Sequence, residues 1–197
     1  MPYKFKFYED GNTQPKFQCN LKKIQCAYIN PSNRHQCKRQ VCKGIDLCWY
    51  HLLHEKHLRI KKSTIPGAGM GLFAALPNDG SKAIVFRGAS QNSSGQSICR
   101  YNGEVITKEE STRRYGLYTG PYLAEVNANM DEDGACVRGV GTFCNQAPTA
   151  AQRNANLYVH GGKVFVRAKK NIRNGDEIFL NYGNSYNMNE NTHYSTR

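Results

Sequence analysis

The sequence predicts a mainly β protein with a few short helices and a small metal-binding module in its N-terminal third. Short apolar runs separated by turn residues recur through most of the chain, and residues 61–197 show no helical repeat. Five of the eight cysteines lie between Cys19 and Cys48. At 197 residues, the chain has room for one full-sized domain and one small accessory module.

We divide the chain into four segments. Residues 1–18 mix aromatic residues with Lys, Gly and Pro without a clear period, and we treat them as an arm. Residues 19–57 form the Cys/His-rich module, residues 58–183 the main domain and residues 184–197 a tail. No flexible linker separates the module from the alternating residues 58–63, which predict a strand, so we expect the module and the main domain to touch.

The main domain is predicted to consist largely of short strands. These are expected at residues 71–75, 83–86, 98–101, 122–126, 164–168 and 177–180. One helix is expected from Thr107 to about Tyr115, because Thr107 and Glu110 have the spacing of a capping box, in which the two side chains satisfy opposing backbone donors. Residues 88–95 are polar and rich in Gly and Ser, which predicts a loop between two strands.

The charge of the chain is concentrated near its start, because residues 1–62 carry +9 of the formal net charge of +12. Such a basic balance favours contact with nucleic acid through counterion release, and a merely solvated basic surface is the alternative. No segment resembles a signal peptide, and no apolar run approaches the roughly 20 residues of a membrane span. We therefore expect a soluble intracellular protein without a membrane partner.

The spacing of cysteine and histidine residues indicates a zinc site. The pattern is Cys26-x10-Cys37-x4-Cys42-x5-Cys48-x2-His51. Thiolates and imidazoles are the preferred ligands of structural zinc, and four of them can hold together a segment with too few apolar residues to fold alone. The preferred set is Cys26, Cys37, Cys48 and His51, since the last two lie close together at the start of a predicted helix, and Cys42 is the principal substitute. Reduced cysteines without a metal are the alternative.

Four short segments follow one another in the main domain. They are Gly67-Ala68-Gly69-Met70-Gly71, Tyr101-Asn102-Gly103-Glu104, Phe143-Cys144-Asn145-Gln146 and Glu177-Ile178-Phe179-Leu180-Asn181-Tyr182. In this order they resemble the cofactor and catalytic segments of a SET-domain protein-lysine methyltransferase. The resemblance implies a fold of several small β-sheets with a pseudoknot, in which the segments of Asn145 and Tyr182 lie side by side.

The resemblance also implies site residues. S-adenosylmethionine is the implied cofactor, and the residues expected to bind it are Gly67, Gly69, Met70, Gly71, Tyr101, Asn145 and Gln146. Tyr182 and Tyr122 are the implied catalytic residues, with Tyr115 and Tyr118 as alternatives in the place of Tyr122. A phenolic oxygen can aim the lone pair of a lysine amine at the methyl group, so the transfer itself requires no metal.

Three positions depart from the family pattern. Gln146 stands where the family has His, Asn181 stands for Asp, and Leu180 stands where Phe or Tyr is common. An apolar residue at position 180 leaves room for more than one methyl group, so multiple methylation is our hypothesis. Tyr186 and Tyr194 in the tail are candidates for covering the lysine channel.

The functional hypothesis is methylation of lysine side chains in proteins. A histone tail or nucleosome is the expected substrate, in the nucleus or on chromatin, although ribosomal and other nucleic-acid-bound proteins fit the same argument. The basic zinc module would assist docking on substrate or nucleic acid. A chromatin or nucleic-acid adaptor whose SET fold is weakly active or inactive is the alternative, with Gln146 and Asn181 as signs of lost activity. A third reading is a cysteine hydrolase that uses Cys144 and His160, although neither lies in a nucleophile-like turn.

Overall fold

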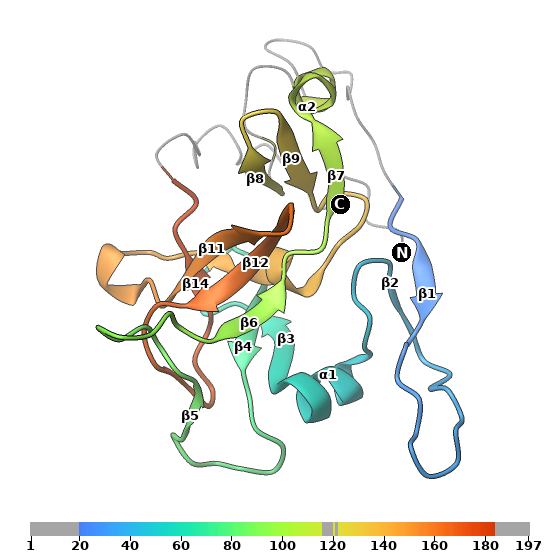
Figure 1. Ribbon diagram of the computed structural model, residues 1–197. Coiled ribbons are helices and arrows are strands. Elements are labelled where there is room, and N and C mark those ends of the chain that lie inside the picture. Colours follow the sequence, from blue (N-terminus) through green and yellow to red (C-terminus); the bar gives the residue numbers. More distant parts are fainter. Residues whose placement is uncertain (1–19, 116–119, 121, 184–197) are drawn as a thin grey trace.

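The computed structural model describes residues 20–115, 120 and 122–183 (Figure 1). The arm, the tail and residues 116–119 and 121 lie outside the described residues. The expectations for Cys19, Tyr118, Tyr186 and Tyr194 therefore also lie outside them.

The described chain is mainly β, as the sequence predicts, with two short α-helices and two 3-10 turns. In chain order, the elements are β1 (Lys23–Gln25), β2 (Gln40–Cys42), α1 (Trp49–Lys56), β3 (Leu58–Lys62), β4 (Met70–Ala74), β5 (Ile84–Phe86), β6 (Ser97–Arg100), β7 (Glu104–Thr107), α2 (Lys108–Tyr115), β8 (Leu123–Asn127), β9 (Met130–Asp133), η1 (Val140–Phe143), β10 (Asn145–Gln146), η2 (Ala150–Gln152), β11 (Ala155–His160), β12 (Lys163–Ala168), β13 (Ile172–Arg173) and β14 (Phe179–Leu180). Every run predicted as a strand contains a strand, with ends shifted by one or two residues.

The strands form several small sheets and no large one. Two sheets have three strands, in the orders β11-β12-β6 and β7-β9-β8, and the others are the pairs β1-β2, β3-β4, β5-β13 and β10-β14. All pairs are antiparallel except β10-β14, which is parallel. That parallel pair joins segments more than 30 residues apart in the sequence, and Figure 1 shows β14 beside the β11-β12 hairpin.

Local contacts account for the end of α1 and the start of α2. Helix α1 is capped at its C-terminus by His57, which has a φ of 55° and donates its backbone N–H to the carbonyl of Leu53. The predicted capping box of α2 is half formed, because the N–H of Glu110 donates to Oγ1 of Thr107 at 3.2 Å. The Glu110 carboxylate does not return to the helix start, since Arg113 and Arg114 lie within 2.6 Å of it.

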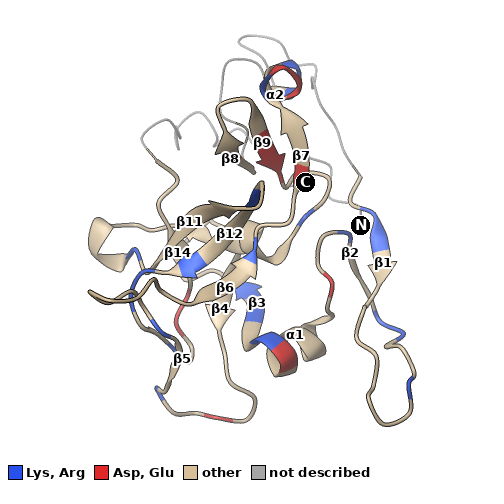
Figure 2. Cartoon of the chain, in the orientation of Figure 1, with Lys and Arg blue, Asp and Glu red and all other residues tan. Residues whose placement is uncertain are grey.

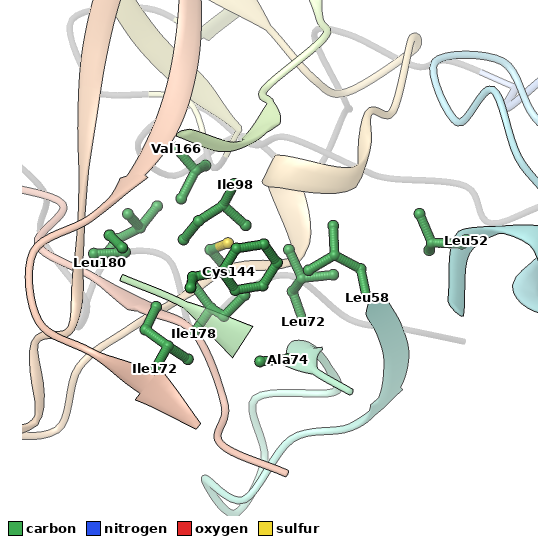
Figure 3. Close-up of a cluster of buried hydrophobic side chains, with 13 residues drawn as sticks. Leu52, Leu58, Leu72, Ala74, Ile98, Cys144, Val166, Ile172, Ile178 and Leu180 are labelled. Atoms are coloured by element: carbon green, nitrogen blue, oxygen red, sulfur yellow. The ribbon is translucent and has the colours of Figure 1, made fainter. Parts of the chain in front are cut away.

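A cluster of 13 buried residues forms the core of the main domain. Ile98, Cys144, Ile172, Ile178 and Leu180 converge in Figure 3, although they come from separate small sheets and loops. Leu52 of α1 belongs to the same cluster, so the helix of the Cys/His module packs onto the main domain. The expected contact between the two parts is therefore present.

The basic residues of the first third lie largely on the surface. Figure 2 shows Lys and Arg along β1 and β3, and the side chains of Lys22, Lys23 and Lys43 are exposed. Within the described residues, none of the helices has the length and apolar character needed to cross a membrane.

Candidate active site and metal centre

The parallel pair β10-β14 assembles the centre of the candidate active site. Asn145 lies opposite Phe179, and Tyr182 follows two residues after β14 ends. Nδ2 of Asn145 donates to the carbonyl of Met70 at 3.1 Å and to Oε1 of Glu177 at 3.0 Å. The pairing brings the Asn145 segment beside the closing segment, as the resemblance implies, and the Asn145 side chain adds the glycine segment.

Glu177 is the buried polar centre of this region. Its Oε1 accepts a hydrogen bond from Oγ of Ser63 at 2.7 Å, while Oε2 accepts from the N–H of Thr64 at 2.7 Å and from its hydroxyl at 2.5 Å. Burial acts to raise the pKa of Glu177, but the donors of Ser63, Thr64 and Asn145 outweigh it, so the pKa lies below its ordinary value. The charged carboxylate holds the start of the glycine segment against Asn145.

The three glycines of residues 67–71 have two different roles. Gly67 and Gly69 have φ values of 80° and 72°, and a Cβ built on either would meet nothing within 4 Å. The surface beyond this turn is open, and Met70 within it is 47 % exposed. A Cβ on Gly71 would instead overlap Oε1 of Glu177. Gly71 is therefore required by an internal contact, whereas the sequence reading assigned all three glycines to approach of a cofactor.

Gln146 of β10 is hydrogen-bonded to the backbone of Tyr182. Its Oε1 accepts a hydrogen bond from the backbone N–H of Tyr182 at 2.6 Å, and Nε2 donates to the carbonyl of Ala147 at 3.4 Å. The N–H of Ala147 in turn donates to the carbonyl of Leu180. The amide that replaces the family's His thus holds the backbone of the candidate catalytic tyrosine.

The hydroxyl of Tyr182 donates to the carbonyl of Cys144 at 2.8 Å. A phenol that donates its proton in this way keeps oxygen lone pairs with which it can accept a hydrogen bond from an amine. The Tyr182 ring packs against the main core cluster, which fixes its position. Its geometry therefore suits an oxygen acceptor held at a defined point.

Tyr101 lies close enough to Tyr182 and Tyr122 for both to affect its pKa. Tyr101 is 6 % exposed, and burial raises its pKa well above 10, with the neighbouring Tyr182, Asp133 and Tyr122 raising it further. The guanidinium carbon of Arg138 lies 3.8 Å from the centre of the Tyr122 ring. The resemblance implies that Tyr101 lies on the cofactor side, and this stays a prediction.

Tyr115, the alternative to Tyr122, has a structural contact of its own. It is 8 % exposed, and its hydroxyl donates to Oδ2 of the buried Asp133 at 2.6 Å. Arg114 also donates to that carboxylate at 2.8 Å, which ties α2 to β9. Because the Tyr115 hydroxyl is already bonded to Asp133, Tyr122 stays the predicted catalytic residue at this place.

The structure brings Cys26, Cys37, Cys48 and His51 together. Their ligand atoms all lie within 4.8 Å of one another. Nδ1 of His51 lies 3.5 Å from Sγ of Cys26 and 3.4 Å from Sγ of Cys48, and Sγ of Cys37 lies 4.0 Å from Sγ of Cys48. Tetrahedral zinc, with Zn–S near 2.3 Å, requires sulfur–sulfur separations of about 3.8 Å and sulfur–nitrogen separations of about 3.5 Å. The donor set therefore fits a zinc ion.

Surrounding groups hold these side chains in place. Cys26 is fully buried, and its sulfur accepts the backbone N–H of Cys48 at 3.2 Å. Arg39 donates to Sγ of Cys48 at 3.9 Å. The ring of Tyr28 stacks on His51 with centroids 3.7 Å apart, which fixes the imidazole plane.

Cys42, the predicted substitute, is not among the four. It lies in β2 and lines a hollow of about 510 Å³ between the module and the main domain, together with Trp49 and Arg59. His54 of α1 stacks on Tyr50 with centroids 4.2 Å apart. The set that spacing favoured is thus the one that the fold assembles.

Cys144 does not have the surroundings of a nucleophile. It is 1 % exposed within the core cluster, and burial raises the pKa of its thiol well above 9. His160 lies at the end of β11. A buried, protonated thiol is a poor nucleophile, so the structure argues against the hypothesis of a cysteine hydrolase.

A sequence model of the SET domain matches residues 89–183. That span contains Asn145, Gln146, Glu177 and Tyr182, which the structure has brought together. The chain contains a SET domain. The match begins after the glycine segment, so the placement of residues 67–71 in this SET domain comes from their contacts with Asn145 and Glu177.

Solved structures that resemble the chain include two polycomb repressive complexes. The Chaetomium thermophilum polycomb repressive complex 2 matches with 24 % identity and a TM-score of 0.51, covering 68 % of this chain and 16 % of that one. An active polycomb repressive complex 2 in the stimulated state matches with 26 % identity and a TM-score of 0.51, covering 66 % and 15 %. The SET-domain chain therefore spans about one sixth of the length of these relatives. No curated protein sequence matches it significantly.

Glu177 and Arg138 are the site residues that the predicted set omits. Glu177 stands inside the closing segment, and its only sequence signal is an acidic residue next to a run that enters the core. Arg138 lies in a loop with no motif of its own. Its contact with Tyr122 arises only when β8 and the loop after β9 are folded together.

Proposed function

We propose that residues 58–183 transfer methyl groups from S-adenosylmethionine to lysine side chains of proteins. The observation that carries the proposal is the β10-β14 pair, which sets Asn145 against the glycine segment and holds Tyr182 through Gln146. The proposed cofactor and catalytic groups would thus meet at one pair of strands. This juxtaposition is what an in-line transfer between a cofactor and a substrate requires.

The cofactor would lie along the open glycine turn. The exposed backbone at Gly67, Gly69 and Met70 and the amide of Asn145 are groups suited to an adenosyl moiety and a charged amino acid. When bound, S-adenosylmethionine supplies a methyl group on a sulfonium, which becomes a neutral thioether when its carbon–sulfur bond breaks. Gln146 contributes by holding the backbone of Tyr182 beside this site.

The tyrosine groups would receive the substrate lysine. The oxygen of Tyr182 would accept an N–H of the neutral amine and so direct its lone pair toward the methyl carbon. Tyr101 and Tyr122 would provide aromatic walls that desolvate the amine, which lowers its pKa and favours the neutral form. The new methylammonium then loses a proton to water before any further transfer.

The proposed substrate is a histone tail or nucleosome, at a nuclear or chromatin location. Support comes from the polycomb complexes among the structural relatives and from the exposed lysines of the module. The zinc ion held by Cys26, Cys37, Cys48 and His51 would keep that basic surface folded. Each phosphate contact made by this surface would release a counterion, so docking would weaken as salt rises.

Multiple methylation of one lysine is part of the proposal. Leu180 has no hydroxyl with which to hold a partly methylated amine in one orientation. Leu180 itself is 1 % exposed in the core, so any effect that it has on the methylation state would be indirect. Mass spectrometry of the products should show dimethyl-lysine or trimethyl-lysine, and only monomethyl-lysine at saturation would contradict this point.

The test is methyl transfer from labelled S-adenosylmethionine to nucleosomes, free histones and a ribosomal fraction. Tyr182→Phe removes the hydroxyl that donates to Cys144 and should lower kcat by about 100-fold or more. Its matched control is Tyr158→Phe, because the Tyr158 hydroxyl bonds the exposed Ser97 and its loss should leave transfer unchanged. Absence of cofactor binding by calorimetry would overturn the proposal and favour the adaptor.

A further inference from the structure

The turn that follows β2 lies directly against the main domain. It belongs to the Cys/His-rich module, whose described residues 20–57 we call the metal module. The carbonyl of Lys43 accepts the backbone N–H of Arg138 at 2.8 Å. The carbonyl of the next residue, Gly44, accepts Nδ2 of Asn102 at 2.5 Å. Two consecutive carbonyls of the module thus hold two separate loops of the SET domain.

Gly44 fits this contact because it has no side chain. Its φ is 105°, which L side chains rarely adopt, and it is buried. A Cβ at this position would lie 2.6 Å from the carbonyl carbon of Arg138 and 2.8 Å from its nitrogen. Any larger residue would therefore have to displace the backbone of Arg138.

The two loops held by the turn carry the walls of the proposed lysine channel. Asn102 directly follows Tyr101, and its own φ is 62°. Arg138 places its guanidinium over the ring of Tyr122. Gly139 packs so closely that a Cβ on it would overlap the carbonyl of Tyr101. A shift of Arg138 or Asn102 would therefore move Tyr101 and Tyr122.

The cofactor side is held by different contacts. Glu177 takes its hydrogen bonds from Ser63, Thr64 and Asn145, all of which belong to the main domain. Among the described residues, none of the hydrogen-bond donors to Glu177 comes from residues 20–57. A disturbance of the module turn is therefore expected to reach the tyrosines before it reaches the glycine segment.

We propose that the Lys43–Gly44 turn positions Tyr101 and Tyr122 through Asn102 and Arg138, so that the metal module sets the geometry of the lysine channel. Gly44 and Asn102 are positioning residues, since neither is placed to touch the reacting atoms. This inference rests on the proposed methyl transfer and deepens it. The module then contributes to turnover of the substrate lysine in addition to any contact with nucleic acid.

Gly44→Ala tests the inference while leaving the four metal ligands intact. The matched control is Gly161→Ala, because Gly161 has a φ of 56° but a Cβ there would meet nothing within 4 Å. Gly44→Ala should lower kcat/KM for the protein substrate by about tenfold or more, since small misplacements of reacting groups have large effects on rate. The Kd of S-adenosylmethionine should stay within about twofold, and the control should match the wild type in both.

A second variant keeps the inference testable if Gly44→Ala does not fold. Asn102→Gly keeps the left-handed backbone accessible and removes only the side-chain hydrogen bond to Gly44. Like Gly44→Ala, Asn102→Gly should lower kcat/KM, and its zinc content should be unchanged. Wild-type kcat/KM in both variants, or an equal loss of cofactor affinity, would overturn the inference.

A spectroscopic measurement separates this inference from the proposed activity. In protein labelled with 3-fluorotyrosine, the resonances of Tyr101 and Tyr122 can be assigned through their Phe variants. Gly44→Ala should shift both and leave Tyr158 unchanged, because Tyr158 lies on β11 against Phe165. Unshifted resonances refute the positioning role whether or not the chain transfers methyl groups. If Gly44→Ala shifts both resonances but the wild type binds no cofactor, the positioning role is supported and the proposed transferase activity is refuted.

Discussion

The metal module and the SET domain are held together by different means. The module, residues 20–57, has five buried hydrophobic residues, Cys26, Ile45, Cys48, Leu52 and Leu53, and two of these are sulfur ligands of the candidate metal site. The SET domain has an apolar cluster that draws on many small sheets (Figure 3). A short segment with little apolar surface needs a metal where a larger one uses burial. Helix α1 joins the two, because it carries His51 on one turn and inserts Leu52 into the cluster.

Removal of the proposed zinc ion should have the largest effect, because it should unfold the module and leave most of the SET domain folded. Structural zinc contributes on the order of 10 kcal/mol to folding of small domains, so chelation should unfold residues 20–57. Hydrogen exchange should show full loss of protection there and partial loss at β3, with the β11-β12 hairpin retained.

Cysteine variants sharpen the same experiment. Cys37→Ser should abolish stoichiometric zinc binding, measured by mass spectrometry under native conditions. Cys42→Ser is the control, because Cys42 lies outside the four and lines the hollow beside Trp49. If both variants lost zinc equally, the assignment of the four ligands would be wrong.

Truncation of the apolar core tests the other half of the comparison. Ile178 is fully buried, and Ile178→Ala should reduce the free energy of unfolding by about 2–5 kcal/mol. Ile84→Ala is the matched control, since Ile84 is 40 % exposed and the change should cost about 0.5 kcal/mol or less. Urea unfolding of the zinc-loaded protein measures both, and equal losses would contradict a core centred on Ile178.

The smallest expected effect is a dependence of protein stability on pH that arises from Glu177. Its pKa is lowered in the folded state, so its contribution to stability is present above the ordinary value of 4.5 and is lost as pH falls below it. The difference in Tm between wild type and Glu177→Gln should therefore be largest near neutral pH and shrink below about pH 4.5. Glu55→Gln, at an exposed position, should show no such change. A difference independent of pH would show that the Glu177 charge contributes nothing.

Much of the fold could be predicted because its signals are local. Alternating apolar residues and turn residues marked the strands, and the spacing of Cys48 and His51 marked the start of α1. Longer strands such as β9 and β11 were not predicted, and neither were the shortest, such as β10 and β13, which have two residues each. Strands this short carry no period, and they exist only because a distant partner supplies the hydrogen bonds.

The order of the motifs and the metal-ligand spacing can be read from the sequence, because they depend on residue type along the chain. Which cysteine is left out, which glycine lies against an internal carboxylate and which loop packs on Tyr101 could not be read there. The surroundings of Cys42, Gly71 and Tyr101 are set by contacts between segments far apart in the chain. Such contacts depend on the path of the whole backbone, and the same path places Gly44 of the metal module against Arg138.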